Sequence, residues 1–372
     1  MTNLQNRDPD KRLHTLDLAR GVSVIVMVCV HTLWMYADHN VQADTLFGHI
    51  MHILGKGTAS FLVAMGVSLA LSRRRSVKAM LIRGVGLLLL GYSMNLLKFV
   101  VPITVFDTMP MAFIQAYGWQ LPLSSGQLMY LTLTGDILQM AGLSLLIIGG
   151  FKLHCIHRNY VLALASIIAV GSGWLRTESA SWGGGYIAEL LVGYTYQVYF
   201  PVIPWISAIL AGFYLGRYKV ETQRSAAQLF SHGARLGLVA LAFGIAALTL
   251  DFQAQFGNFF HLSFGGISYL IGLNLCLLYV LNRFVTARFM QWAGYALVSY
   301  ASRHVTSLYI LQWVIICWGM GVVGYATLSA WHTALLMPVM LLLTLGIHYS
   351  GKVALSSVVA RLPRRQKLPV PG

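Results

Sequence analysis

Residues 304–351 read HVTSLYILQWVIICWGMGVVGYATLSAWHTALLMPVMLLLTLGIHYSG, and no Asp, Glu, Lys or Arg interrupts these 48 residues. A membrane-spanning helix needs about 20 predominantly apolar residues. The stretch is therefore long enough for two spans with a turn between them. An uncharged apolar run of this length predicts a chain embedded in a bilayer.

The composition extends this prediction to the whole chain. Of its 372 residues, 57% are hydrophobic and 10% are charged, and the mean hydropathy is +0.68. Soluble domains have about 45–50% apolar and about 25% charged residues. These values exclude an ordinary cytosolic enzyme, a disordered chain and a secreted disulfide scaffold. The cysteines show neither disulfide nor zinc spacing, and we expect no cleavable signal peptide.

Ten apolar segments are predicted to form the spans of an all-α polytopic membrane helix bundle. They cover residues 17–37, 46–72, 79–98, 133–151, 159–176, 198–216, 234–250, 266–282, 303–323 and 330–350. With the N-terminus in the cytoplasm, 23 of the 26 Lys and Arg residues fall at the inner ends, Lys98 and Arg176 fall outside, and Lys56 lies within a helix. The positive-inside rule produces such a bias. The sequence therefore predicts about ten helices with both termini inside.

The same count gives the domain organisation. Residues 1–16 are predicted to be a cytoplasmic N-terminal segment, residues 17–351 a single transmembrane domain, and residues 352–372 a basic cytoplasmic tail. The net charge of +15 indicates contact with anionic lipid headgroups and not with nucleic acid. We expect a plasma membrane location, which is the inner membrane if the host is a Gram-negative bacterium. The oligomeric state, a homodimer included, is left open.

Ionisable side chains inside a span are costly, and for that reason they are candidate functional groups. Arg20 and His31 are eleven residues apart in the first span. At about 100° per residue they lie on the same helix face, about 16 Å apart along the axis. Asp17 lies on that face too and can pair with Arg20. The face predicts a ligand with an anionic group at the cytoplasmic end and a reactive group near His31.

The second span carries a further polar face. His49, His52 and Lys56 follow an i, i+3, i+7 pattern, which places them on one side of a helix. His52 should reach the depth of His31, whereas Lys56 should lie deeper. Histidine is the usual general base near neutral pH. The alternative is that these groups only hydrogen-bond neighbouring helices. No residues have the spacing of a persuasive metal site.

Five segments, in order along the chain, resemble a known family. KRLHTLDLARGVSVIVMVCVH (11–31) resembles the first-helix signature of the membrane acyltransferase superfamily, which includes the heparan-alpha-glucosaminide N-acetyltransferase-like family, with its bacterial branch, and the acyltransferase-3 family. The acyltransferase-3 proteins have an Arg, ten residues and a His, matched by Arg20 and His31. The segments that favour the heparan-like branch are LGKGTASFLVAMGVSLALSRRR (54–75), GDILQMAGLSLL (135–146), FPVIPWISAILAGFYLGR (200–217) and SRHVTSLYILQW (302–313).

The resemblance implies a bundle with a central cavity that moves an acetyl or other short acyl group from cytoplasmic acyl-CoA to a hydroxyl or amine of an extracytoplasmic sugar or glycan. The general base would be His31, or His39 in the first outer loop. Lys56 would stabilise the oxyanion, and Asp136 would either orient the imidazole or neutralise Lys56. The implied ligands of the CoA phosphates are Arg20, Arg83 and Arg303, the implied substrate contacts are His52 and Gln139, and no metal is expected.

A different class of function stays open at this point. The same buried charges would suit a transporter or flippase for an amphiphilic or lipid-linked substrate. The sequence shows neither an internal repeat nor Gly- or Pro-broken spans in matching halves, and both are typical of secondary transporters. The sequence therefore favours the acyltransferase.

Overall fold

The computed structural model describes residues 13–72 and 76–361. Most of the predicted N-terminal segment, the basic residues 73–75 and the end of the predicted tail lie outside the described residues. The described residues fold into helices. The first of these are α1 (His14–Tyr36), α2 (His39–Asp44), α3 (Leu46–Gly55), α4 (Thr58–Leu71), α5 (Val77–Asn95), the π-helical turn η2 (Leu96–Val100), α6 (Val101–Thr104), α7 (Met111–Ala116), α8 (Ser125–Thr132) and α9 (Ile137–Gly150).

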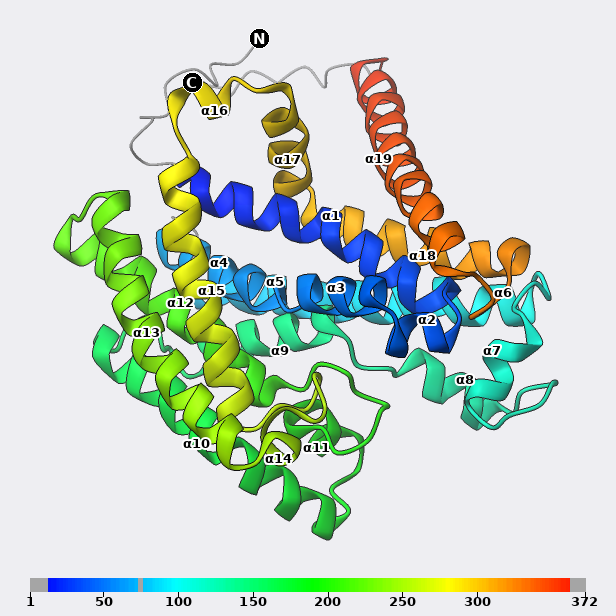
Figure 1. Ribbon diagram of the computed structural model, residues 1–372, viewed down its shortest axis with the longest axis horizontal. Coiled ribbons are helices and arrows are strands. Elements are labelled where there is room, and N and C mark those ends of the chain that lie inside the picture. The colour runs from blue at the N-terminus through cyan, green and yellow to red at the C-terminus, as the bar shows by residue number, and fades with distance from the viewer. Residues whose placement is uncertain (1–12, 73–75, 362–372) are drawn as a thin grey trace, which may run out of the picture.

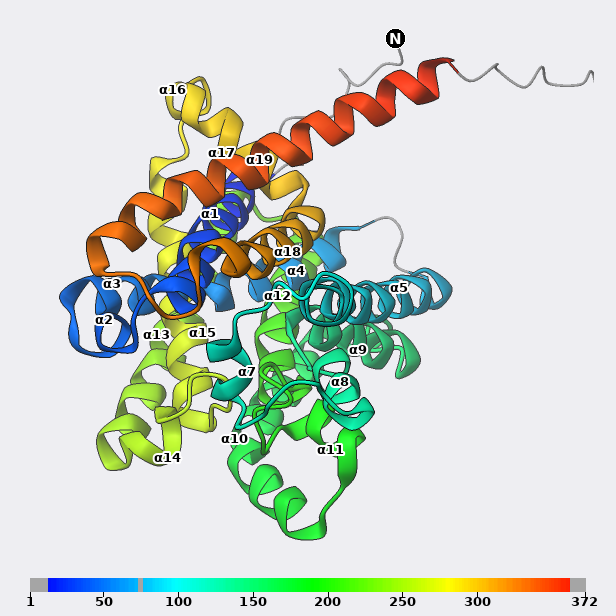
Figure 2. The same ribbon diagram turned by 90° about the vertical axis from the view of Figure 1, so that its right-hand side faces the viewer.

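The second half of the chain continues the same pattern of long helices joined by short ones. Its elements are α10 (Arg158–Trp182), α11 (Gly185–Val192), α12 (Val202–Thr222), α13 (Ala226–Leu250), α14 (Phe252–Phe256), α15 (Phe264–Phe284), α16 (Ala287–Met290), α17 (Ala293–Arg303), α18 (Val305–Val323) and α19 (Ala330–Arg361). The helix α19 packs along α18 and extends beyond the rest of the bundle (Figure 2).

Eight helical stretches in the described residues are long and apolar enough to cross a membrane. They coincide with eight of the ten predicted spans. The other two predicted spans form α9, which has 14 residues, and α12, which has 21 residues and is buried over most of its length. The prediction of an all-helical, multi-pass membrane protein is confirmed. The count of ten spans and the inward orientation of both termini stay predictions.

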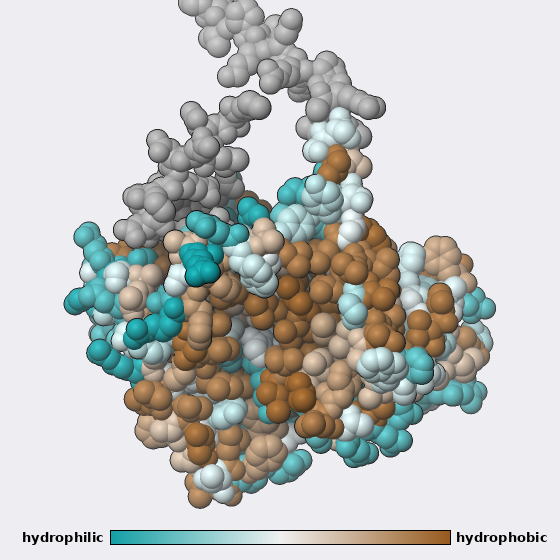
Figure 3. Space-filling view, turned by 45° about the horizontal axis from the view of Figure 1, so that its top comes forward, coloured by the Kyte–Doolittle hydropathy of each residue, from teal (hydrophilic) through white to brown (hydrophobic). Residues whose placement is uncertain are grey.

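The two ends of the bundle differ in charge. Figure 1 shows the turn between α12 and α13, together with α16, at the upper left of the molecule, and α7, α8, α11 and α14 toward its lower and right sides. The turn between α12 and α13, the parts of α12, α13 and α15 near it, and α16 carry five arginines, and we call this end the basic side; they are Arg217, Arg224, Arg235, Arg283 and Arg288. Between the ends the surface is apolar, and hydrophobic residues fill the middle of the face in Figure 3 while hydrophilic residues gather at its edges.

The centre of the bundle depends on glycines where two helices cross closely. The helix α12 is buried from Pro204 to Gly216 and packs against α4. A Cβ atom on Gly66 would overlap the Ile209 carbonyl oxygen, and one on Gly212 would overlap the Val63 carbonyl oxygen. The two backbones are therefore in contact, an approach that small residues permit in membrane bundles.

This contact predicts that Gly212→Ala destabilises the protein, because one added methyl group must push α12 away from the α4 backbone. Overpacking of this kind costs about 1–3 kcal/mol. Gly86→Ala is the matched control, since a Cβ there meets nothing within 4 Å. Thermal unfolding of the purified proteins in detergent should show a lower midpoint for Gly212→Ala and an unchanged or higher one for Gly86→Ala. Equal midpoints would contradict the close crossing.

The second predicted span is interrupted, which corrects the polar face expected for it. The helix α3 ends at Gly55, and Lys56 and Gly57 form a turn before α4 begins. Asn274 of α15 donates a hydrogen bond to the Lys56 carbonyl oxygen at 3.3 Å, so the break is satisfied from a neighbouring helix. The predicted single face is wrong because His49 is exposed, whereas His52 and Lys56 line a cavity.

Candidate functional site

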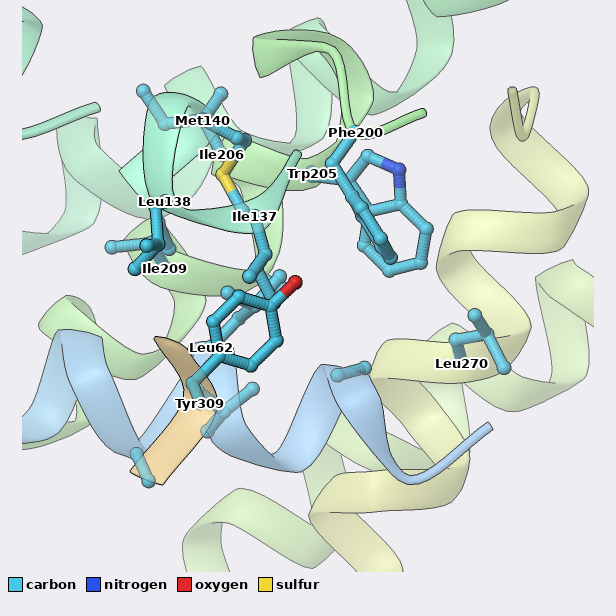
Figure 4. Packing of buried hydrophobic residues seen from close by; sticks show 14 of the residues in the cluster. Leu62, Ile137, Leu138, Met140, Phe200, Trp205, Ile206, Ile209, Leu270 and Tyr309 are labelled. Carbon is cyan, nitrogen blue, oxygen red and sulfur yellow. The ribbon is translucent and has the colours of Figure 1, made fainter. Parts of the chain in front are cut away.

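Two cavities lie along α1 and share part of their walls. The histidine cavity, of about 530 Å³, is lined by residues that include His31, His52 and Lys56. The arginine cavity, of about 630 Å³, is lined by residues that include Arg20, Arg83 and Arg303. Both cavities are lined by Met27, Ile137 and Tyr309. Figure 4 shows how Tyr309 of α18 approaches Ile137 at the start of α9.

Aromatic rings hold His31 in place. The imidazole is only 6% exposed and stacks on the Trp313 indole, with ring centroids 4.0 Å apart and an interplanar angle of 23°. Tyr309 meets it edge-on at 6.0 Å, and Trp34 lies 5.4 Å away. These contacts fix the plane of the ring. They come from α1 and α18, which places a preoriented imidazole at the wall of the histidine cavity.

Polar atoms without partners gather around this imidazole. The Nδ1 atom of His31 is buried, Gln312 lies beside the ring, and Trp313 stacks on it. Nδ1, both side-chain polar atoms of Gln312 and Nε1 of Trp313 have no hydrogen-bond partner of good geometry among the described residues. Buried polar groups are normally satisfied in a native structure. A bound ligand or ordered water at this point would satisfy these groups.

A buried ion pair lies next to this cluster. The Lys98 Nζ atom is 3.6 Å from Oδ2 of Asp136, and the two side chains are 3% and 8% exposed. Lys98 also lies over the Trp313 ring, 4.5 Å from its centroid. The charge count places Lys98 on the outer side, at the end of the third predicted span, and the structure places it within η2, where the α5 helix widens into a π-helical turn. Such turns are frequent at functional sites.

Local structure fixes Asp136 at the start of α9. Its Oδ1 atom accepts the Ile137 backbone N–H at 2.7 Å, and Gln139 Oε1 accepts the Asp136 backbone N–H at 3.1 Å. This is a reciprocal capping box. The preceding residue, Gly135, exchanges backbone hydrogen bonds of 2.8 Å with Gln197 and Tyr199. Of the two roles predicted for Asp136, the pairing with Lys56 is not found, since Asp136 pairs with Lys98. The other role, orienting the imidazole, stays a prediction, and Gln139 serves the helix cap.

The arginine cavity is organised by a second polar network. Arg20 donates to Oδ1 of Asp17 at 2.8 Å, as the spacing on α1 predicts. Ser302 of α17 donates to the same oxygen at 3.0 Å. Arg83 of α5 and Arg303 of α17 are exposed at this cavity. The three arginines predicted to act together are thus brought together from three helices, at the end of α1 nearest the basic side.

An aromatic loop closes the other end of the histidine cavity. Phe259 and Phe260 line it, and the Trp205 indole donates to the Phe260 carbonyl oxygen at 2.8 Å. The adjoining His261 Nε2 atom lies 2.7 Å from the Val198 carbonyl oxygen. Burial lowers the pKa of His261, although the Val198 carbonyl opposes this, and burial raises the pKa of Tyr199 to about 12. The lower pKa of His261 favours its neutral imidazole, and the higher pKa of Tyr199 favours its neutral phenol.

The structure does not bring every predicted residue into the cavities. His52 lines the histidine cavity, where its Nδ1 atom lies 3.5 Å from the Trp34 indole nitrogen. Lys56 lines it too, 5.1 Å from the Phe256 ring centroid. His39, by contrast, is exposed on α2 and meets Tyr325 edge-on at 6.2 Å. Sequence reasoning did not find Lys98, Tyr309 or Trp313 as site residues.

The sequence profile of the heparan-alpha-glucosaminide N-acetyltransferase catalytic family matches residues 12–255, about two thirds of the chain. The chain belongs to this family. The resemblance found in the sequence is thereby confirmed, and the family is one of membrane acetyltransferases that use acetyl-CoA. No curated protein sequence matches the chain closely enough to be compared with it. Within the described residues, no group of three or more His, Cys, Asp or Glu side chains could hold a metal ion.

The matched region contains most of the candidate site but not all of it. Arg20, His31, Arg83, Lys98 and Asp136 lie inside residues 12–255. The residues that stack on His31 from α18, and Arg303 from α17, lie beyond the match. The rest of the site is therefore supplied by helices that lie beyond the matched region.

Proposed function

We propose that the protein transfers an acetyl group from acetyl-CoA, bound in the arginine cavity, to a hydroxyl or amine of a carbohydrate acceptor bound in the histidine cavity. The observation that carries the proposal is the shared wall of Met27, Ile137 and Tyr309. Because the two cavities adjoin at these residues, the acetyl group of a donor in the arginine cavity would reach an acceptor in the histidine cavity close to His31. The acceptor sugar and the side of the membrane that it faces are part of the proposal.

The arginine cavity suits the phosphate end of CoA. Guanidinium groups bind phosphates through paired, charge-assisted hydrogen bonds. Arg83 and Arg303 are exposed and can reorient toward a ligand, while Arg20 is held by Asp17. The cavity volume of about 630 Å³ is in the usual range for small-molecule sites. The apolar residues deeper in the cavity, such as Leu138 and Ile310, would contact the pantetheine arm.

The histidine cavity suits the transfer step. In this mechanism His31 takes a proton from the acceptor hydroxyl or amine while that oxygen or nitrogen attacks the thioester carbonyl carbon. The new C–O or C–N bond forms, the C–S bond breaks, and the CoA thiolate takes the proton that His31 had removed, which frees His31 for the next cycle. Lys56 is the cation that lines this cavity and would stabilise the oxyanion. Positioning of the reactants by the cavity walls would supply much of the remaining acceleration.

The proposal is tested with the purified full-length protein, acetyl-CoA and a panel of amino sugars and glycans. We expect release of free CoA thiol that depends on the acceptor, together with an acetylated product in the mass spectrum. Thiol release that is absent with every acceptor would contradict the proposal. Uptake of an amphiphilic substrate into proteoliposomes without thiol release would favour a transporter.

The arginine cavity makes a separate prediction about substrate affinity. Arg83→Gln and Arg303→Gln should each raise the KM for acetyl-CoA about tenfold, because each removes a charged hydrogen-bond donor worth about 1.5–3 kcal/mol. The value of kcat should change little, since these groups are far from the reacting carbonyl. Arg288→Gln, an exposed arginine on α16 outside the cavity, is the control. A fall in kcat at unchanged KM would contradict a phosphate-binding role.

A further inference from the structure

A second concave site lies on the basic side, separate from both cavities. It is a hollow of about 480 Å³ between the turn that joins α12 to α13 and the end of α15. Figure 1 shows these segments side by side at the upper left. We call it the basic hollow, and its lining includes Arg224, Arg235, Arg283, Gln228 and Asn282.

The polar groups of the basic hollow are matched to an anion. No carboxylate belongs to its lining among the described residues. Asn282 Oδ1 accepts a hydrogen bond from Thr15 at 2.9 Å, and Gln228 Oε1 accepts the Ser225 backbone N–H at 3.1 Å. Both amide oxygens are therefore occupied, which leaves the NH₂ groups as the hydrogen-bonding ends. With three guanidinium groups added, the hollow presents many donors and no carboxylate, while its Ser and Tyr hydroxyls and its histidine can both donate and accept.

Nearby negative charge does not neutralise these arginines. Glu221, near the end of α12, is bound by Arg158 at 2.6 Å and by Arg217 at 2.7 Å. None of the ion pairs found among the described residues involves Arg224, Arg235 or Arg283. The positive-inside rule accounts for arginines on this side of the protein. It does not account for three of them lining one hollow without forming an ion pair with any carboxylate among the described residues.

The walls of the hollow are held by ring contacts. His232 stacks on Tyr218 with centroids 4.1 Å apart, and it lies 3.0 Å from the Tyr214 hydroxyl. Arg283 donates to the Tyr279 hydroxyl at 2.7 Å. The His232 contacts join α13 to α12, Arg283 is held by a residue of its own helix, and α13 packs against α15. Most of the donors are therefore carried by packed helices, and Arg224 lies in the turn between α12 and α13. A preformed site of this kind loses less entropy when it binds a ligand.

We propose that the basic hollow binds a phosphate-bearing ligand. Arginine pairs geometrically with phosphate oxygens, and basic pockets between membrane helices bind phospholipid headgroups. The same chemistry would recognise a free phosphate compound from solution. The inference does not depend on the acyltransferase activity, since the basic hollow shares no lining residue with the arginine or histidine cavity.

The test measures ligand-dependent stabilisation of the purified full-length protein in detergent. One arm titrates inorganic pyrophosphate, and the other titrates phosphatidylglycerol in mixed micelles, with phosphatidylcholine as the zwitterionic reference. Ligands that bind the folded state raise its unfolding midpoint. We expect saturable stabilisation in at least one arm. Stabilisation by pyrophosphate assigns a soluble ligand, and stabilisation by phosphatidylglycerol alone assigns a lipid headgroup.

A matched pair of variants locates the binding. Arg235→Gln with Arg283→Gln should weaken the apparent affinity at least about tenfold, since two charge-assisted contacts are lost. Lys78→Gln with Arg288→Gln removes the same charge from exposed positions outside the hollow and should leave affinity within about twofold. If the double variant does not fold, Arg224→Gln replaces it, since Arg224 is also exposed, and this single variant should weaken the apparent affinity too. Stabilisation in neither arm, or equal weakening in both double variants, overturns the proposal.

Discussion

His31→Ala is expected to lower kcat for acetyl transfer by about 10²–10⁴-fold, the range that general base catalysis supplies. The KM for acetyl-CoA should stay within about twofold, because the predicted phosphate contacts lie in the other cavity. The expectation comes from the geometry of the imidazole. It is stacked on Trp313, lines the histidine cavity and leaves Nδ1 without a protein partner among the described residues. Acceptor-dependent thiol release measures the loss.

Two further variants separate catalysis from packing and from the alternative base. His31→Asn keeps most of the side-chain volume, so it should fold like the parent protein while losing activity as His31→Ala does. His39→Ala should retain activity, since His39 is exposed on α2 and lines neither cavity. Loss of activity in His39→Ala with full activity in His31→Asn would move the general base to His39.

Much of this site follows from local sequence patterns. The eleven-residue spacing between Arg20 and His31 predicts a shared helix face, and the structure places them at two adjoining cavities along α1. The Asp17–Arg20 pair likewise depends only on helical spacing. Such predictions succeed because the period of a helix is the same whichever other helices it packs against. They fail where the helix is interrupted, as at Lys56 and Gly57, since a break satisfied by a distant Asn274 has no local signal.

The two residues that depart from the positive-inside rule were a signal for buried polar contacts that the sequence interpretation did not use. Lys98 and Arg176 are the Lys and Arg residues that the topology left on the outer side, and both have internal partners. Arg176 donates to the carbonyl oxygens of Gly193 and Leu262 at 2.9 Å each. Lys98 pairs with Asp136. A Lys or Arg that the positive-inside rule does not explain is held in place by specific contacts. The sequence shows which residues depart from the rule, but it does not show the residues that they contact.

The contacts around His31 could not be predicted because they join distant segments. Trp313 and Tyr309 read as ordinary apolar positions of α18, and their role depends on how α18 crosses α1. The Lys98–Asp136 pair requires both the π-helical turn and the anchoring of Gly135 by the loop at Gln197. Each is a tertiary arrangement, and helical periodicity alone does not determine it.

The Lys98–Asp136 pair leads to the second large prediction. Lys98→Met should destabilise the protein by about 3–5 kcal/mol, because it leaves a buried carboxylate without its partner. Asp136→Asn should also destabilise it, by leaving the ammonium unpaired. The double variant should regain most of the stability, since the Asn side chain still caps α9 and no buried charge is left uncompensated. Thermal unfolding of all four proteins gives the coupling energy as a double-mutant cycle.

The activity of that double variant decides what the pair does beyond stability. His31 lies within the electrostatic range of both Lys98 and Asp136, and Lys98 contacts the same Trp313 ring as the imidazole. If the pair sets the electrostatic environment and position of His31, the double variant should fold normally and keep a reduced kcat with an altered pH profile. Recovery of kcat along with stability would show a purely structural pair, and additive losses of stability would contradict the coupling itself. The expected result is restored folding without restored transfer, because a neutral pair can fill the same space but cannot reproduce the field of two opposite charges beside the base.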